Sequence, residues 1–208
     1  MKKILCYGDS NTFGLIAEIL ERYEVNERWS GVLSELLKDD YTVIEEGLSD
    51  RNGFLKNQKG YEYNSQEHLP VYLNKTPNIN IIILAVGTND LQFTYDFNAE
   101  ILEAGLLNLI NIVKKYNKET KIIIVPPVKL DKYVALGYFN YQFNEISIER
   151  SNVTFDLYKK IADENNCYYF DFNQIARPSE KDGLHYTIPT HKLIAQKLAE
   201  FITTKIKN

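Results

Sequence analysis

The sequence has little of several features that would mark particular classes of protein. Its 208 residues include two cysteines, one tryptophan, one methionine and three histidines. Neither Cys6 nor Cys167 belongs to a Cys-x-x-Cys or Cys/His spacing, so no zinc or redox motif is present. Both lie in short apolar runs, which predicts small buried strand residues rather than a disulfide. The chain is therefore not a disulfide scaffold, and we expect neither a metal nor a cofactor.

The chain also lacks an excess of positive charge and any long apolar run. It carries 24 Lys and Arg against 28 Asp and Glu, a net charge of -4, which argues against nucleic acid or an anionic membrane as a partner. No 18 uncharged apolar residues run together to cross a bilayer. The apolar stretch after Met1 is too short for a secretory signal. These absences predict a cytoplasmic protein.

What the chain does contain is an ordinary globular composition in a regular order. Apolar residues make up 44% and charged residues 25%, enough for a single domain over residues 1–208. Five short β-rich runs alternate with longer amphipathic stretches, which is typical of a parallel sheet covered by helices. The third and fourth runs are almost continuously apolar, as central strands are. The expected strands are 3–7, 41–45, 79–86, 121–125 and 167–171, and the expected helices are 28–37, 63–73, 98–116, 144–166 and 187–206.

Small and polar residues gather where these strands are expected to end. Because ligands bind beyond the carboxyl ends of parallel strands, the segments there are the first candidates for function. They are Gly8-Asp9-Ser10 after the first strand, Glu46-Gly47-Leu48-Ser49 after the second, Gly87-Thr88-Asn89-Asp90 after the third, and, beyond the fifth, Asp182-Gly183-Leu184-His185.

Together these segments supply the groups that acyl transfer through a covalent intermediate requires. Ser10 can present a hydroxyl nucleophile at the sheet edge. His185 can take its proton, and Asp182, three residues earlier on the same loop, can orient the imidazole. The backbone amides of Ser10 and Gly47 and the side-chain amide of Asn89 can converge on the oxyanion.

In order and rough spacing, the segments resemble the four blocks of the SGNH (GDSL-type) hydrolases over almost the whole chain. Residues 4–10, 28–33 and 43–49 look closest to the branch of aryl esterases and acyltransferases. The resemblance implies an α/β, flavodoxin-like three-layer sandwich with a central five-stranded parallel sheet. It implies a catalytic triad of Ser10, His185 and Asp182 and an oxyanion hole from Ser10, Gly47 and Asn89. It further implies a serine esterase that hydrolyses, and can transfer, short acyl groups of small esters, in a chain that can form a homo-oligomer.

The sequence departs from that branch at Asn11, where leucine is common, and at Asn52-Gly53, where threonines are common. Both departures bear on the shape of the pocket. The residues expected to shape the acyl or alcohol site are Asn11, Phe13, Trp29, Phe54 and Phe93, together with Tyr138 and Phe139. Trp29 heads an amphipathic helix, so simple packing is the alternative for it.

Each feature also has an ordinary structural reading, because such residues are common in turns. Only the joint order of the four segments favours catalysis. Asp9 and Asp90 could hold magnesium or phosphate, but loop hydrogen bonding is preferred because matching carboxylates are lacking. His68 is expected to be a surface or partly packed helix residue. His191, on the last expected helix, is a rival base expected on the helix surface or beside the site.

Several other functions remain as alternatives. The same triad could deacetylate carbohydrates or act as a lysophospholipase or thioesterase. A metallophosphoesterase would need more ligands than three histidines provide. A nucleotide-binding module would need a glycine-rich phosphate loop, and neither signature follows any strand. A catalytically inactive binding relative is the last alternative, and loss of activity in a Ser10→Ala protein would separate it from an esterase.

Overall fold

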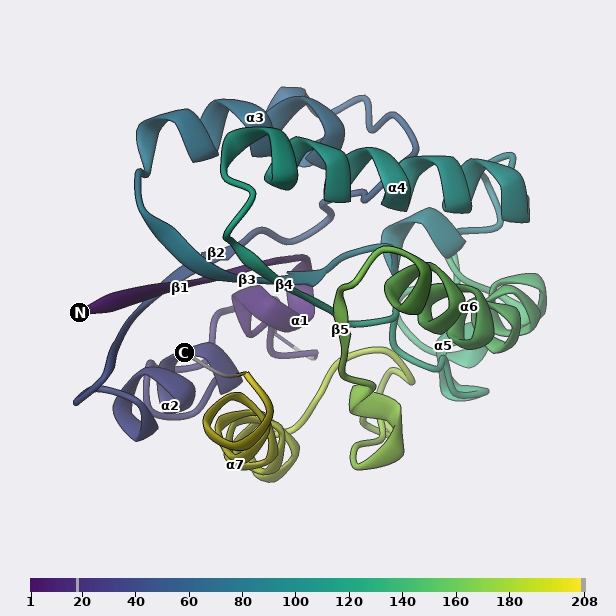
Figure 1. Ribbon diagram of the computed structural model, residues 1–208. Coiled ribbons are helices and arrows are strands. Elements are labelled where there is room, and N and C mark those ends of the chain that lie inside the picture. Colours follow the sequence, from purple (N-terminus) through teal and green to yellow (C-terminus); the bar gives the residue numbers. More distant parts are fainter. Residues whose placement is uncertain (18, 207–208) are drawn as a thin grey trace.

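The computed structural model describes residues 1–17 and 19–206 and is built around one parallel β-sheet (Figure 1). Its strands follow the order β2-β1-β3-β4-β5, and every neighbouring pair is parallel. The expected α/β fold with a central five-stranded parallel sheet is therefore confirmed. The strands are β1 (Lys2–Gly8), β2 (Tyr41–Gly47), β3 (Ile79–Ala85), β4 (Lys121–Ile124) and β5 (Tyr168–Tyr169).

Helices cover both faces of this sheet (Figure 1). On one side pack α3 (Ser65–Lys75), α4 (Ala99–Tyr116) and α6 (Glu145–Glu164), and on the other α2 (Trp29–Leu36) and α7 (Ile188–Lys205). The shorter helices are α1 (Ser10–Phe13) and α5 (Tyr133–Leu136), with 3₁₀ turns η1 (Tyr61–Tyr63), η2 (Asn89–Leu91) and η3 (Phe172–Gln174). No helix in the described part of the chain is long and apolar enough to cross a membrane.

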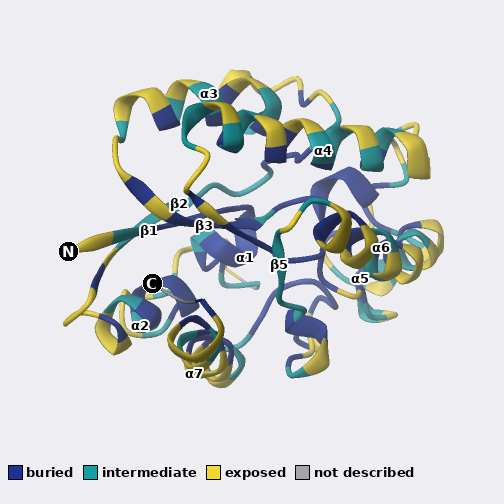
Figure 2. Ribbon diagram, in the orientation of Figure 1, coloured by how far each residue is buried: buried dark blue, intermediate teal, exposed yellow. Residues whose placement is uncertain are grey.

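Alternate strand residues divide the core into two clusters, one on each face of the sheet. In β1, Ile4 and Cys6 point into the cluster beneath α2 and α7, whereas Leu5 and Tyr7 point into the cluster beneath α3 and α4. Burial on both faces is the reason the strands are nearly continuously apolar. Figure 2 shows the same division, with buried residues on the sheet and exposed residues on the outward faces of the helices.

The fifth strand is shorter than its expected range of 167–171. Its regular part pairs only with β4, at the edge of the sheet. Beyond it, the side chain of Asp171 accepts a hydrogen bond from the N–H of Asn173 at 2.9 Å and begins η3. Because this carboxylate offers a backbone N–H a hydrogen bond in place of pairing between strands, the strand ends and a 3₁₀ turn begins.

The strand order reverses between β1 and β3, because the chain runs from β1 outward to β2 and then returns to the other side of β1. At such a point the two following loops diverge, and ligands of open α/β sheets bind there. The loops that diverge here carry Ser10 and Asn89. The topology thus places both residues where a substrate is expected.

Candidate active site

Ser10, His185 and Asp182 form a chain of hydrogen bonds at the carboxyl ends of the strands. Oγ of Ser10 lies 2.9 Å from Nε2 of His185, and Nδ1 of His185 lies 2.6 Å from Oδ2 of Asp182. All three residues are buried, with Ser10 6% exposed and His185 2%. An ionised carboxylate can only accept, so it holds the imidazole proton on Nδ1 and leaves the lone pair of Nε2 facing the serine hydroxyl. This arrangement can remove a proton from Ser10.

The turn that presents Ser10 depends on the two residues before it. A Cβ atom at Gly8 would lie 2.0 Å from Oγ1 of Thr12, so a larger residue would push the turn out of place. Asp9 is the N-cap of α1, and its side chain accepts a hydrogen bond from the N–H of Asn11 at 3.1 Å. The cap starts the helix at Ser10 and fixes the serine against the end of β1.

Asn11 ties this turn to the loop that carries His185. Its Nδ2 donates to the carbonyl oxygen of Leu184 at 3.1 Å, and its Oδ1 accepts from the N–H of Tyr186 at 3.1 Å. One amide therefore holds the backbone on both sides of the histidine. Asn11 is buried and uses both halves of its amide internally. Asn11 is therefore a link between two loops, and its expected part in shaping the substrate site stays a prediction.

Asp182 also fixes the loop on which it lies. Its Oδ1 accepts from the N–H groups of Leu184 and His185 at 2.9 and 3.0 Å, while its Oδ2 faces the imidazole. Gly183 has a φ of +65°, and a Cβ atom there would lie 2.5 Å from the nitrogen of Val134. The left-handed turn thus requires glycine, and it allows a carboxylate three residues before the histidine to fold back onto it.

The other expected oxyanion donors lie at the ends of β2 and β3. Nδ2 of Asn89 donates to the carbonyl oxygen of Arg51 at 3.0 Å, which uses one of the two hydrogens on that nitrogen. Gly47 pairs with Gly8 in the parallel register, and a Cβ atom at Gly47 would lie 2.2 Å from the nitrogen of Phe13. Glycine is therefore needed there for the close packing of β2 against α1. The oxyanion roles of Ser10, Gly47 and Asn89 stay predictions.

The two further carboxylates at the strand ends take part in loop hydrogen bonds. Asp90 accepts from the three consecutive N–H groups of residues 53–55 at 2.6 to 2.9 Å, and burial raises its pKa to about 6 against the effect of these bonds. Burial also raises the pKa of Asp9, opposed by hydrogen bonds from Thr88 and Asn11. Among the described residues, no group of His, Cys, Asp and Glu is arranged to hold a metal ion.

The other two histidines are buried, so of the positions expected for them the helix surface is wrong, and each is packed within the protein. Nδ1 of His191 accepts a hydrogen bond from the N–H of Trp29 at 3.3 Å, at the start of α2, and burial lowers the pKa of His191 to about 3. The ring of His68 stacks on Tyr7, and its Nδ1 lies 3.2 Å from the Tyr7 hydroxyl. Both imidazoles thus support the core, and the imidazole beside Ser10 is that of His185.

Three of the expected substrate residues pack against other parts of the protein. Trp29 is fully buried, and its Nε1 donates to the carbonyl oxygen of Asn11 at 3.1 Å, so the expectation that it lines the substrate site is corrected. Phe13 is half-buried beneath the guanidinium of Arg22. Phe54 is half-buried, with its ring 6.4 Å from that of Tyr158. An indole that fills a core position has no face left for a ligand.

The other expected aromatics lie nearer His185. The ring centroid of Phe139 is 5.1 Å from that of His185, and the ring of Tyr138 is 5.1 Å from Phe139. The N–H of half-buried Phe93 donates to the carbonyl oxygen of Gln142 at 3.1 Å and joins the loop after η2 to this aromatic segment. Tyr138 is well exposed, so this segment can form part of the mouth of the site.

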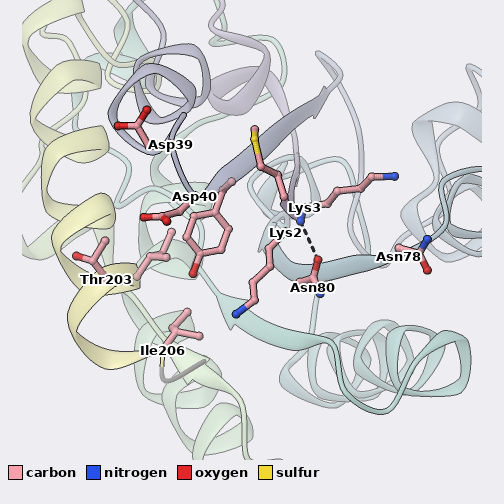
Figure 3. Close-up of a pocket in the computed structure, with 11 residues that line it drawn as sticks. Lys2, Lys3, Asp39, Asp40, Asn78, Asn80, Thr203 and Ile206 are labelled. Carbon is pink, nitrogen blue, oxygen red and sulfur yellow. Dashed lines mark hydrogen bonds between the residues drawn. The ribbon is translucent and has the colours of Figure 1, made fainter.

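A large groove lies at the opposite end of the sheet, away from Ser10. This groove, of about 800 Å³, is lined by residues at the amino ends of the strands and at the end of α7 (Figure 3). Among them the N–H of Lys3 donates to Oδ1 of Asn80 at 2.8 Å. Volume alone would therefore point away from Ser10. We place the candidate active site by its hydrogen-bonded groups instead.

Burial of an arginine beside the site could not have been read from the sequence. Arg51 is 1% exposed, although arginine is among the residues least often buried. Its carbonyl oxygen binds Asn89, and its guanidinium contacts the end of β1. The local sequence around it is polar, so no apolar pattern marks the position. The only available signal was its place directly after the second candidate segment.

Comparisons with known proteins identify the family and agree with the fold. A family model described as GDSL-like Lipase/Acylhydrolase matches residues 6–193. An aryl esterase from M. smegmatis is similar in structure, with 25% identity, a TM-score of 0.88, and coverage of 98% of this chain and 99% of that one. A carbohydrate acetylesterase from Sinorhizobium meliloti gives 26% identity, a TM-score of 0.89 and the same coverage. No curated protein matches the sequence. Since the family model spans most of the chain and the fold agrees with it, the chain belongs to the GDSL-like lipase/acylhydrolase family, the SGNH-type hydrolases.

Proposed function

We propose that the protein is a serine esterase that cleaves small esters through an acyl-enzyme on Ser10. The observation that carries the proposal is the unbroken chain of hydrogen bonds from Asp182 through His185 to Ser10. Every member is buried, and hydrogen bonds fix the loop that carries Asp182 and His185 and the turn that carries Ser10, so the groups need little reorganisation before reaction.

In the first half of the reaction, Nε2 of His185 takes the hydroxyl proton while Oγ of Ser10 bonds to the ester carbonyl carbon. The carbonyl oxygen becomes an oxyanion, for which the Ser10 and Gly47 amides and the Asn89 side chain are the proposed donors. Collapse of the tetrahedral intermediate breaks the bond to the alcohol oxygen, which receives the proton from His185. Asp182 stabilises the imidazolium throughout.

In the second half, water attacks the acyl carbon and gives its proton to His185. The bond to Ser10 then breaks, Oγ takes the proton back, and the carboxylic acid leaves. An alcohol in place of water would give a new ester, so acyl transfer is part of the proposal. The chemistry needs no metal.

We further propose short acyl groups as the preferred substrates. Ser10 is only 6% exposed, so a long acyl chain would have to displace neighbouring side chains. Each methylene that fits a pocket would improve binding by about 0.8 kcal/mol, so a deep groove would give rates that rise with chain length. Acetylated carbohydrates are a second candidate class, favoured by the similarity to a carbohydrate acetylesterase. Lysophospholipids and thioesters carry longer or different groups, and nothing in the site favours them.

The test is hydrolysis of 4-nitrophenyl esters by wild-type, Ser10→Ala and Ser34→Ala proteins. Ser34 lies half-buried on α2 and serves as a matched control. We expect Ser10→Ala to lose on the order of 10⁴-fold or more in kcat, and Ser34→Ala to keep wild-type activity. Activity that survives Ser10→Ala would overturn the proposed function.

The same assay extended to other esters tests the substrate. Acetyl and butyryl esters should react faster than octanoyl esters, and acetylated sugars should release acetate. A maximum at octanoyl would contradict the short-acyl proposal. Activity lost with EDTA and restored by a divalent cation would favour a metallophosphoesterase instead.

A further inference from the structure

Arg51 has an unusual number of buried contacts for a residue that lies outside the catalytic chain. Its Nη1 donates to the carbonyl oxygens of Gly8 at 3.1 Å and Glu46 at 2.7 Å. Its Nη2 donates to Oε1 of Glu46 at 2.9 Å, and its Nε donates to the carbonyl oxygen of Glu62 at 3.1 Å. The plane of the guanidinium lies over the ring of Tyr7, with Cζ 4.5 Å from the centroid.

These contacts join two of the segments that carry the proposed oxyanion donors. Gly8 lies two residues before Ser10 at the end of β1, and Glu46 directly precedes Gly47 at the end of β2. A single nitrogen, Nη1, bonds the carbonyl oxygens of both strand ends. The planar guanidinium therefore sets the distance between the backbone that leads to Ser10 and the backbone that leads to Gly47.

The backbone of the same residue orients the third donor. The carbonyl oxygen of Arg51 accepts from Nδ2 of Asn89 at 3.0 Å. Because a carbonyl can only accept, this bond requires the amide nitrogen of Asn89, and not its oxygen, to face the strand ends. One residue is thus connected to all three proposed oxyanion donors.

Stability alone gives little reason to bury this cation. Taking a guanidinium out of water is costly, and a buried ion pair is often no more stable than apolar side chains of similar volume. The partner carboxylate of Glu46 is itself about one-fifth exposed. The ion pair within the protein therefore offsets only part of the cost of burying the guanidinium. A buried arginine is better explained by the geometry that its fork of donors imposes.

We propose that Arg51 is a positioning residue for the oxyanion hole, holding the Ser10, Gly47 and Asn89 segments at the spacing that the tetrahedral intermediate requires. This inference rests on the proposed function. Arg51 acts through these groups and does not itself touch the reacting atoms.

Arg28 provides a matched control on the other side of β2. It is also buried and bonds both oxygens of Glu45, the residue before Glu46, at 2.6 and 2.8 Å. Its Nη1 donates a further hydrogen bond to the carbonyl oxygen of Tyr23 at 2.9 Å. Arg28 and Arg51 are therefore alike in burial and ion pairing, but only Arg51 contacts the strand ends next to the site.

The experiment compares Arg51→Lys and Arg28→Lys, each with its Tm measured and its rates normalised to folded protein. A lysine keeps the charge but presents its donors from one point, so it cannot span Gly8, Glu46 and Glu62. With 4-nitrophenyl acetate, Arg51→Lys should lower kcat by about 10- to 100-fold with little change in KM, because alignment serves the developing charge. Arg28→Lys should leave kcat within about threefold of wild type, since it touches none of these groups.

A second readout separates positioning from a general structural effect. Phenylboronic acid forms a tetrahedral adduct with an activated serine, and its affinity should fall in Arg51→Lys but not in Arg28→Lys. In an Asn89→Ala background, the further loss of kcat from Arg51→Lys should be much smaller, because the two residues act on one step. Full additivity of the two losses would overturn the inference.

Other outcomes also decide the question. Equal losses in the two lysine variants, or a loss confined to KM, would make Arg51 a structural residue. If Arg51→Lys does not fold, Glu46→Gln replaces it, since this loosens the guanidinium at a partly exposed partner. Wild-type kcat in Glu46→Gln would then overturn the inference. An esterase activity that survives Ser10→Ala would overturn the proposed function, whereas Ser10-dependent activity that is unchanged in Arg51→Lys would overturn this inference alone.

Discussion

Polar residues at the two ends of the central sheet differ in burial and in hydrogen bonding. At the carboxyl ends, Asp9, Asn89, Asp90 and Asp182 are all buried and hydrogen-bonded. At the amino ends lies the groove of about 800 Å³ (Figure 3). Most of its polar side chains are exposed, among them Asp39, Asp40, Asn78 and Thr203. Cavity volume is therefore a poor guide to the position of the candidate active site in this protein. Burial and bonding of polar groups are the better guide.

The physical reason is the cost of leaving a buried polar group unpaired. An exposed side chain loses little when a partner is removed, because water replaces it. A buried carboxylate or amide must be bonded within the protein, and those bonds fix its orientation. Among the described residues, the buried groups at the carboxyl ends are therefore held in the orientations that the proposed reaction requires.

The largest expected effect is that of Asp182→Asn. An asparagine can keep the Oδ1 contacts to the loop, but its amide nitrogen would face Nδ1 of His185 as a donor. The imidazole would then carry its proton on Nε2 and could not accept one from Ser10. We expect a loss of about 10⁴-fold in kcat at nearly unchanged Tm, measured with 4-nitrophenyl acetate. A variant that retains a tenth of the wild-type rate would contradict this role for Asp182.

Next in size is Asn89→Ala, which removes one proposed oxyanion donor at the carboxyl ends. We expect a loss on the order of 10²- to 10³-fold in kcat, with a smaller change in KM, since the donor serves charge that develops in the transition state. Steady-state kinetics would measure both constants. An effect on KM alone would show that Asn89 binds substrate without stabilising the oxyanion.

A smaller effect concerns His191 and is seen in stability. Burial lowers the pKa of His191 to about 3, whereas an unfolded histidine titrates near 6.5. As pH falls below about 6.5, the unfolded state gains a proton that the folded state does not, so stability is lost progressively toward pH 3. Between pH 7 and 5 this amounts to about 2 kcal/mol. Asparagine at position 191 can still accept from Trp29 but cannot titrate.

Urea unfolding at pH 7 and pH 5 would therefore show a steeper loss for wild type than for His191→Asn. The raised pKa of Asp90 works in the opposite direction, because its stabilising contribution is present at low pH and lost as pH rises through about 6. That contribution is common to both proteins and cancels in the comparison. Equal losses in the two proteins would mean that His191 is not held neutral by the fold.

The smallest effect is expected at the amino ends, where Asn80→Ala near the start of β3 is the counterpart of Asn89→Ala in η2, beyond the end of that strand. Oδ1 of Asn80 accepts from the N–H of Lys3 at an exposed position. We expect a loss of less than about 1 kcal/mol in the free energy of unfolding, or a few degrees in Tm, and no change in kcat. A large fall in kcat would remove the contrast between the two ends and assign a function to the groove.

The sequence was a good guide wherever the relevant signal is local. The order of apolar runs predicted the parallel sheet, since strands buried on both faces must be apolar throughout. The helix expected over residues 98–116 agrees with Ala99–Tyr116, because its apolar residues recur at helical spacing. Ser10, Asp182 and His185 could be selected because each directly follows a strand or occupies a recognisable loop. The weakly held edge strand at Tyr168–Tyr169 was predicted too long.

Interactions between distant parts of the chain could not be predicted in the same way. The bond between Asn11 and Leu184 spans 173 residues, and that between Trp29 and His191 spans 162. Nothing in the neighbouring residues indicates such pairs. For that reason the sequence did not indicate that Asn11 joins two loops, that Trp29 is buried in the core, or that His191 packs against the start of α2.

The fold class, the order of the candidate segments that follow the strands, and the side chains proposed for acyl transfer can all be predicted from the sequence. This is possible because side-chain periodicity and turn residues act over a few positions of the chain. The burial of Arg51, the packing of His191 against the start of α2, and the hydrogen bonds of Asp9, Asn89, Asp90 and Asp182 follow only from the tertiary structure. They depend on which distant segments meet once the core is packed, because most buried polar groups find their partners there.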